Sequence, residues 1–321
     1  MPLVDVLSAA SNASRLHDEP GVLEPFTYVA AQPGKGVRGR LLGAFNSWMD
    51  VPEAEMKSIT KVIGILHNAS LILDDIEDGS QLRRGQPAAH IVYGIPRTVN
   101  AATYTQTLVY QELGCMKEAR LEYCHLVTIV TDELACLYHG QGLDIMWRDL
   151  FHCPSETEYI GMVRNSTTIQ LSTFLMGLID DRDRRPFEDG GDYVALADLI
   201  GVYFQIRDDY MNLQSSEYAS SKGFAEDLDE GKFSFPIIHG VQVDISNHLI
   251  LDVLKAQPAT AALKIQAIDY LKAETKSFDY TLSILNALES NIIRNIAALG
   301  GNEELSTIIA DLHVAPTAGN F

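Results

Sequence analysis

The sequence has few of the features that mark secreted, disulfide-stabilised or membrane-spanning proteins. Its 321 residues include only four cysteines, at Cys115, Cys124, Cys136 and Cys153, and no C-x-x-C pair, so reduced thiols are expected. No uncharged apolar run reaches the roughly 18 residues that a membrane-spanning helix needs. The amino-terminal residues lack the basic segment and apolar core of a secretory signal. These absences predict a soluble, cytoplasmic protein without a membrane span.

Positive charge is also scarce. The chain has 24 lysine and arginine residues against 43 aspartate and glutamate residues, which gives a formal net charge of −19. This imbalance argues against nucleic acid or an anionic membrane surface as the main partner. It also makes each local group of lysine and arginine residues more informative than it would be in a basic chain.

Linkers and internal repeats are missing as well. No stretch rich in serine, glycine and proline divides the chain, and 46% of its residues are hydrophobic, which is enough for a large core. Apolar positions recur at helical spacing from end to end, with proline and glycine mostly between the periodic segments. From Leu196 to Leu213, for example, apolar residues recur every three to four positions. The sequence therefore predicts one all-α domain over residues 1–321.

Two acidic clusters follow apolar helical segments, D-D-I-E-D at Asp74–Asp78 and D-D-Y-M-N at Asp208–Asn212. Carboxylates beside a core are unfavourable unless a cation binds them, and their oxygens suit divalent metals. Cations follow each cluster, in the segments Leu82–Gly85 and Lys222–Lys232, which a merely solvated acidic face would not need. The two clusters therefore predict a divalent metal that faces a highly anionic ligand.

Three further segments have both a functional and a structural interpretation. Gly34–Arg40 holds three cations and three glycines, as a backbone that approaches phosphate needs, or it is a basic turn in solvent. His67 shares a helical face with Asp74, although a lone histidine in an apolar segment is often a core group. His139–Asp144 is either a functional tract or a helix break at its glycines.

Several linked segments occur in order along roughly residues 23–241: Pro33-Gly34-Lys35, Leu66-His67-Asn68, Asp74–Asp78, Leu82–Gly85, Gly140–Gly142, Phe204–Tyr210 and Glu226–Pro236. In order and spacing they resemble the trans-isoprenyl diphosphate synthases, and most closely the eukaryotic, fungal-type geranylgeranyl diphosphate synthases. The combination is far more specific than either acidic cluster alone.

The resemblance implies an all-α isoprenoid synthase fold, a helical bundle around a central substrate cavity, in which the two acidic helices face each other and Mg²⁺ bridges them to substrate. It implies these metal ligands: Asp74, Asp78 and Asp208, with Asp75, Asp209 and Asn212 in the same shells. It implies these partners for the isopentenyl diphosphate: Lys35, Arg38, His67 and Arg84. It implies these residues around the allylic diphosphate: Arg83, Thr167, Gln205, Lys222 and Lys232.

The implied reaction is a Mg²⁺-dependent 1'-4 head-to-tail condensation of isopentenyl diphosphate with dimethylallyl, geranyl or farnesyl diphosphate. Metal and cations neutralise the leaving diphosphate, the isopentenyl double bond attacks the allylic carbocation, and a proton is lost. The residues expected to promote this step are Asp74, Asp75, Asp78, Asp208, Lys222 and Lys232. A homodimer or larger homo-oligomer is expected from the resemblance alone.

One departure from the family pattern keeps other functions open. The family's N-K-T-G-G reads N-S-T-T-I at 165–169, so Ser166 stands where a lysine normally contacts the allylic diphosphate. Such a lost contact costs on the order of 1.5–3 kcal/mol, which leaves a low-activity regulatory subunit as an alternative. A class I terpene cyclase shares the fold but normally has a different second acidic site. The chain also suits the prenyltransferase domain of a longer bifunctional synthase.

The expected product length follows from the side chains near the first acidic cluster. Ala69 and Ser70, about one turn before Asp74, are small and leave room for a long tail. On the next helix, Gln106 and Thr107 stand where related synthases tend to have an aromatic pair. These residues predict C20 geranylgeranyl diphosphate as the product, with C25 and C30 chains still open.

Overall fold

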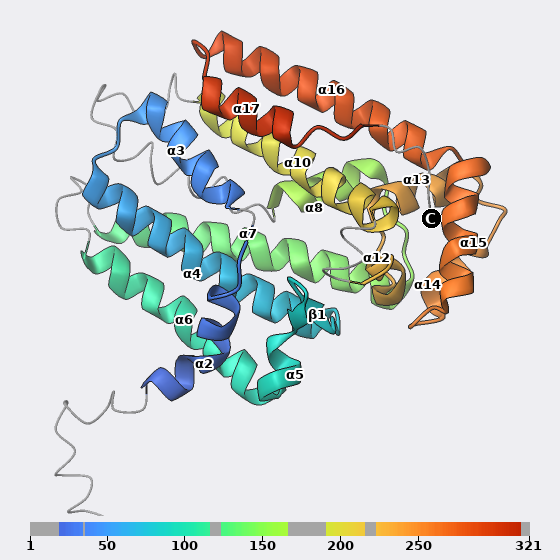
Figure 1. Cartoon of the computed structure of the whole chain (residues 1–321), viewed down its shortest axis with the longest axis horizontal. Coiled ribbons are helices and arrows are strands. Elements are labelled where there is room, and N and C mark those ends of the chain that lie inside the picture. Colours follow the sequence, from blue (N-terminus) through green and yellow to red (C-terminus); the bar gives the residue numbers. More distant parts are fainter. Residues whose placement is uncertain (1–18, 35, 116–122, 166–190, 216–222, 316–321) are drawn as a thin grey trace, which may run out of the picture.

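The computed structural model describes residues 19–34, 36–115, 123–165, 191–215 and 223–315, and helices make up most of them (Figure 1). The helices of the first half are α2 Glu19–Ala30, α3 Val37–Met49, α4 Glu53–Glu77, α5 Ala89–Tyr93, α6 Ile95–Cys115, α7 Tyr123–Leu150 and α8 Glu156–Asn165. Those of the second half are α10 Gly191–Gln214, α12 Glu226–Glu230, α13 Phe235–Val243, α14 Leu249–Lys255, α15 Ala261–Ala273, α16 Ser277–Ala298 and α17 Glu303–Asp311. The all-α prediction is confirmed.

The strands among the described residues form one short hairpin directly after α4. Strands β1 (Leu82–Arg83) and β2 (Gln86–Pro87) pair antiparallel, with Leu82 opposite Pro87 and Arg83 opposite Gln86. This hairpin turns the chain back toward the end of α4 that carries the first acidic cluster (Figure 1).

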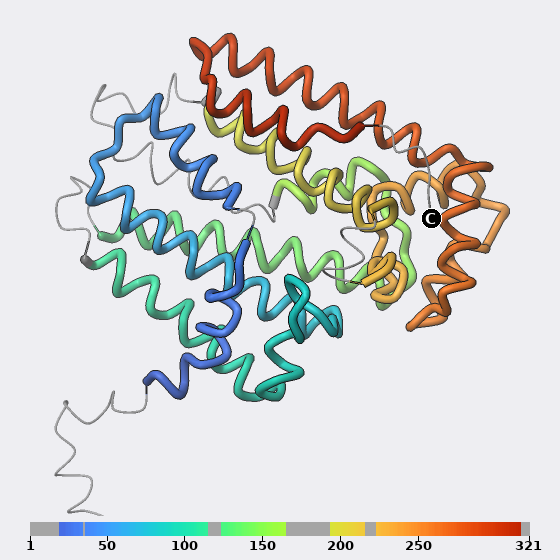
Figure 2. The backbone as a smooth tube through the Cα atoms, viewed as in Figure 1, coloured from blue at the N-terminus to red at the C-terminus, as the bar shows by residue number. Residues whose placement is uncertain are grey.

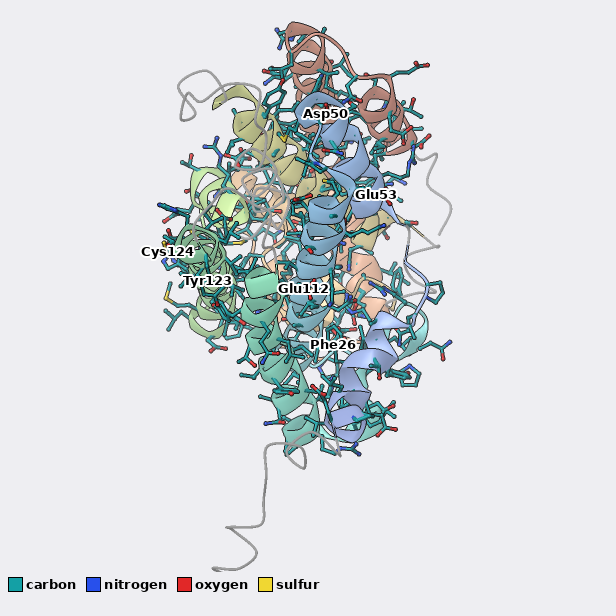
Figure 3. The ribbon with its side chains drawn as sticks, turned by 90° about the vertical axis from the view of Figure 1, so that its left-hand side faces the viewer. Phe26, Asp50, Glu53, Glu112, Tyr123 and Cys124 are labelled. Carbon is teal, nitrogen blue, oxygen red and sulfur yellow. The ribbon has the colours of Figure 1, made fainter. Side chains whose placement is uncertain are left out.

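The long helices lie alongside one another with similar axes (Figure 2). Figure 3 looks along them from the end where α4 and α7 begin, near Glu53 and Tyr123, and where α6 approaches its end, near Glu112. α4 and α7 therefore run in the same direction and α6 runs opposite to them. An ion pair of 2.5 Å between Lys61 and Glu112 joins α4 to α6 at this end.

Helix α10 is central to the hydrophobic core. Every member of its predicted apolar stripe is at most 1% exposed, namely Leu196, Ile200, Tyr203, Ile206, Tyr210 and Leu213. The stripe packs mainly against α16, with α8 and α13 beside it. The opposite side of α10 carries the polar residues of the second acidic cluster, as expected from their spacing.

The last helices return to the first part of the chain. α17 packs on α3, where Arg40 pairs with Glu304 at 2.9 Å and with Asp311 at 2.8 Å. Trp48 Nε1 donates a hydrogen bond of 3.1 Å to the carbonyl of Gly301. The main cluster of buried hydrophobic residues extends from Leu41 to Val314, and a smaller second cluster lies around Val29 and Ile72. The single domain over residues 1–321 stays a prediction. Within the described ranges, no helix is long and apolar enough to cross a membrane.

Candidate active site

The two acidic clusters lie at the carboxyl-terminal ends of α4 and α10. Asp74 is in the last turn of α4, Asp78 is its C-cap residue, and Gly79, at φ +69°, leaves the helix in the left-handed conformation that glycine allows. A helix carries partial negative charge at this end, so aspartates here are doubly unfavourable without cations. The clusters therefore require positive charge, either from neighbouring side chains or from a bound cation.

The hairpin after α4 brings Arg83 back to the first cluster. Its Nε donates to Asp75 Oδ1 at 2.7 Å, and its Nη2 donates to Asp74 Oδ2 at 3.1 Å. The Asp75 side chain is 1% exposed, against 36% for Asp74. Burial raises the pKa of Asp75, although Arg83 opposes the shift. Asp75 thus points into the protein against Arg83, whereas Asp74 reaches solvent.

Helix α7 lies along the other side of the first cluster. Gln141 Nε2 donates to Asp74 Oδ1 at 3.3 Å, and Arg148 Nη1 donates to Asp78 Oδ1 at 2.6 Å. Burial, together with the neighbouring Asp74 carboxylate, raises the pKa of Asp78 to about 7 even though Arg148 lowers it. Burial is thus the main reason why the charged form of Asp78 is disfavoured, and the Asp74 carboxylate adds to it.

The second cluster divides in the same way into an inner and an outer aspartate. Asp209 is 2% exposed and accepts hydrogen bonds from Tyr159 Oη at 2.5 Å, Gln205 Nε2 at 2.9 Å and the Phe235 amide at 2.8 Å. Burial raises its pKa against these donors. Asp208 is only half-buried and interacts electrostatically with Arg38 of α3. Asp209 is therefore committed to the protein, whereas Asp208 faces a cation from another helix.

Asn212 is buried beside this cluster, and its Oδ1 accepts a hydrogen bond of 3.2 Å from the Asp227 amide of α12. The contact ties the end of α10 to the start of α12. Asn212 thus supports the geometry of the cluster through the backbone of a neighbouring helix.

The two acidic ends are close enough to influence each other. Burial raises the pKa of Glu230 at the end of α12, and Asp78 of α4 raises it further. Burial lowers the pKa of Lys232, but Asp144, Asp227 and other carboxylates outweigh this effect and raise it. Lys232 thus lies among carboxylates from α7, α10 and α12, and Asp78 lies on the side of α4.

A second group of side chains brings several cations together around His67. The pKa of His67 falls to about 2, because of burial first and then Arg38, Arg84 and Arg83. The pKa of Arg38 is lowered to about 10 by the surrounding protein and by Arg84, although solvent reaches its side chain. Arg84 is held by its Nη1, which donates to the carbonyls of Gln32 at 3.0 Å and Val29 at 3.3 Å. Arginines held this close to one another form a site for an anion.

The oxygen donors fit Mg²⁺ only together with another ligand. Among the described residues, no group of three His, Cys, Asp or Glu side chains is close enough to hold a metal. Mg²⁺ commonly takes one or two carboxylates, keeps several waters and completes its shell with substrate phosphates. Asp74, Asp78 and Asp208 offer hard oxygen donors of this kind. The arrangement suits Mg²⁺ that binds jointly with a diphosphate.

Some predicted site residues lie outside the described part of the chain, namely Lys35, Thr167 and Lys222, as does Ser166. Two contact residues were missed at the level of sequence, Arg148 and Tyr159. Arg148 follows Asp144 by four residues, so helical spacing offered a signal. Tyr159 offered none, because its partner Asp209 is 50 residues away.

The two small residues before the first cluster have different surroundings. Ala69 is fully buried in a small core cluster with Val29, Ala89 and Ala102. Ser70, four residues before Asp74, shares the face of that aspartate and is half-buried. That these two residues leave room for a long substrate tail stays a prediction.

The two predicted positions on α6 also differ from each other. Thr107 is exposed and donates to the Tyr104 carbonyl at 2.6 Å. Gln106 is half-buried and forms a hydrogen bond with Tyr138 of α7. Of this pair, only Gln106 turns toward a neighbouring helix.

Comparisons with known proteins agree with the geometry. The chain matches the Polyprenyl synthetase family over residues 19–271. It is 41% identical over 314 residues to a geranylgeranyl pyrophosphate synthase of Mucor circinelloides f. lusitanicus, across 97% of this chain and 99% of the relative. It is 44% identical over 317 residues to geranylgeranyl pyrophosphate synthase AN1592 of Hericium erinaceus, across 92% and 93%. It is also 40% identical over 300 residues to IDS-like terpene synthase 1 of Melampsora lini, across 92% and 89%. The chain therefore belongs to the polyprenyl synthetase family.

Proposed function

We propose that this chain is a Mg²⁺-dependent trans-prenyl diphosphate synthase that joins isopentenyl diphosphate to allylic diphosphates and releases geranylgeranyl diphosphate. The observation that carries the proposal is the pairing of two sites. The carboxylates around Lys232 suit a metal-bound diphosphate, and the cations around His67 suit a second, metal-free diphosphate. An enzyme that condenses two diphosphates needs both.

Asp74, Asp78 and Asp208 would hold Mg²⁺ at the allylic diphosphate. Bound there, the metal supplies the charge that neutralises the leaving group. Lys232 adds a protein cation on the same side, and the sequence assigns Lys222 and Thr167 to that diphosphate as well. Asp75 and Asp209 would act indirectly, because Asp75 holds Arg83, and Asp209 is held by Tyr159 and Gln205. Their role would be to fix the outer aspartates.

Arg38, His67 and Arg84 would bind the diphosphate of isopentenyl diphosphate, with Lys35 beside them. Because its pKa is near 2, His67 stays neutral at any working pH and can both donate and accept a hydrogen bond. The carbonyls of Val29 and Gln32 orient the Arg84 guanidinium before substrate arrives. Such a prearranged site lowers the entropy lost on binding.

The reaction would then proceed by ionisation and addition. The allylic C–O bond breaks, and its electron pair leaves with the diphosphate. The isopentenyl double bond attacks the resulting carbocation and forms the new C–C bond. A proton passes from the adduct to the released diphosphate, which balances the charge. The protein contributes electrostatic stabilisation and orientation, and no protein nucleophile is required.

A second candidate is a terpene synthase of the cyclase type, which ionises a single diphosphate. The Melampsora lini relative is itself named a terpene synthase. The cations around His67 count against this candidate, because a cyclase has no second diphosphate to bind. A regulatory subunit would bind diphosphates but elongate nothing without a partner.

The test is a turnover assay on the purified chain. Isopentenyl diphosphate and Mg²⁺ are incubated with the C5, C10 or C15 allylic primer, and chain lengths are read by mass spectrometry. We expect C20 product that disappears with chelator and in Asp74→Ala and Asp208→Ala. A matched control is Glu53→Ala, which removes an exposed carboxylate paired with Lys57 at the end of α4 remote from the acidic cluster. Products released without isopentenyl diphosphate would favour a terpene synthase, and no product at all would favour a regulatory subunit.

A further inference from the structure

The glycine-containing tract His139–Asp144 does not interrupt its helix. α7 runs continuously from Tyr123 to Leu150, so the interpretation of this tract as a helix break is wrong. At helical spacing, Gln141, Asp144 and Arg148 share one face. Because α7 runs in the same direction as α4, successive residues of this face meet successive residues at the acidic end of α4. Gln141 contacts Asp74, and Arg148 contacts Asp78. The proposed function uses none of these three residues directly.

Arg148 makes the closest contact along this face. Its Nη1 donates to Asp78 Oδ1 at 2.6 Å, and its Nε lies 3.5 Å from Asp144 Oδ2. The arginine side chain is 7% exposed, and both carboxylate side chains are 8% exposed. A buried charge is retained only where a partner compensates it, so the two aspartates and Arg148 depend on one another.

The charges around Asp78 explain why it needs a fixed cation. Asp78 interacts electrostatically with two further carboxylates, Asp74 and Asp144, and with two cations, Arg148 and Lys232. Arg148 contacts Asp78 directly, at 2.6 Å. Without Arg148, the Asp78 carboxylate would face two like charges and turn away from them.

We propose that Arg148 is the positioning residue for Asp78, and that it holds this carboxylate in the orientation in which a divalent cation and a diphosphate receive it. The proposal rests on the proposed function, because it assumes that Asp78 meets a metal. The end of α4 then lies between two arginines, Arg83 of the hairpin and Arg148 of α7. Arg83 fixes the buried side of this helix end through Asp75, and Arg148 fixes Asp78, the last aspartate of the cluster.

The test measures metal binding directly. Mn²⁺ is titrated into the protein in the presence of inorganic pyrophosphate, and bound Mn²⁺ is followed by electron paramagnetic resonance. Loss of a residue that orients a metal ligand typically weakens metal affinity about 10- to 100-fold. We expect Arg148→Gln to raise the Mn²⁺ dissociation constant by this factor. Arg148→Lys should recover part of the loss, since lysine keeps the charge but cannot reach Asp78 and Asp144 together.

The control is Arg97→Gln, which breaks an exposed ion pair of 2.9 Å with Glu24 and should leave Mn²⁺ binding unchanged. If Arg148→Gln does not fold, the double variant Arg148→Gln/Asp144→Asn carries the same test with one like charge fewer. Unchanged or tighter Mn²⁺ binding in the glutamine variant would overturn the proposal. So would a lysine variant that binds no better than the glutamine variant.

An assay of primer elongation distinguishes a failure of this inference from a failure of the proposed function. A wild-type chain that binds Mn²⁺ with pyrophosphate but elongates no primer contradicts the proposed function and leaves the role of Arg148 measurable. A wild-type chain that elongates while Arg148→Gln keeps both its metal affinity and its KM for Mg²⁺ contradicts only the inference.

Discussion

The unusual surroundings of His67 predict how the stability of this protein depends on pH. In the folded protein the pKa of this histidine is about 2, because it is buried and close to Arg38, Arg84 and Arg83. In the unfolded chain its pKa is about 6.5. At a pH between these two pKa values, His67 binds a proton in the unfolded chain but not in the folded protein. The contribution of His67 to stability is therefore complete above pH 6.5 and is lost as the pH falls.

The magnitude follows from the pKa difference. Each pH unit well below 6.5 removes about 1.4 kcal/mol of unfolding free energy, so the fall from pH 7 to pH 5 removes about 2 kcal/mol. His67→Gln has no ionisable group at this position and should escape this loss. Other groups titrate equally in both proteins, so the comparison isolates the histidine.

The assay is urea unfolding of wild type and His67→Gln at pH 7, 6 and 5, with the midpoint and slope fitted at each pH. We expect the wild type to lose about 2 kcal/mol more than the variant over this range. Equal losses would show that His67 takes up its proton normally in the folded protein. The cluster of Arg38, His67 and Arg84 would then not be the strongly positive site described here.

Four further perturbations have defined outcomes. Arg83→Met leaves the buried Asp75 carboxylate without its cation and should lower the unfolding free energy by about 3–5 kcal/mol in urea titrations; a loss of less than about 1 kcal/mol, typical of an exposed pair, would contradict the buried contact. Gly240→Ala adds a methyl group that clashes with a leucine side chain of α15, so thermal unfolding should show a loss of about 1–3 kcal/mol. Gly64→Ala meets no atom within 4 Å and should instead gain about 0.5–1 kcal/mol. Because the pKa of Asp78 is about 7, its proton competes with metal below that pH, and Mn²⁺ affinity should fall up to about tenfold per unit of acidification; a flat profile between pH 7 and 5 would refute it.

Periodicity predicted the helices well where one face was uniformly apolar. The stripe from Leu196 to Leu213 is buried along its whole length, because a helix with one wide apolar face has only one way to pack it. The glycines at 140–142 left helix and break equally open. The structure shows a continuous helix there despite the low helical propensity of glycine, and this helix packs on α8 and α6.

The sequence could not separate neighbouring aspartates within each cluster. Asp74 and Asp75 are adjacent in the motif, yet Asp74 reaches solvent whereas Asp75 is buried against Arg83. That distinction depends on which side of α4 the core covers, and local spacing does not determine it. The same holds for Asp209, whose closest donor, Tyr159, comes from another helix.

The contact of α17 with α3 links the last described helix to the helix that carries Arg38. Arg38 stands in the first turn of α3, and Glu304 and Asp311 pair with Arg40 on the outside of the same helix. The family match ends at residue 271, so α17 lies beyond it. A chain shortened to the matched region would keep every proposed ligand and yet lose the ion pairs that hold the helix of Arg38.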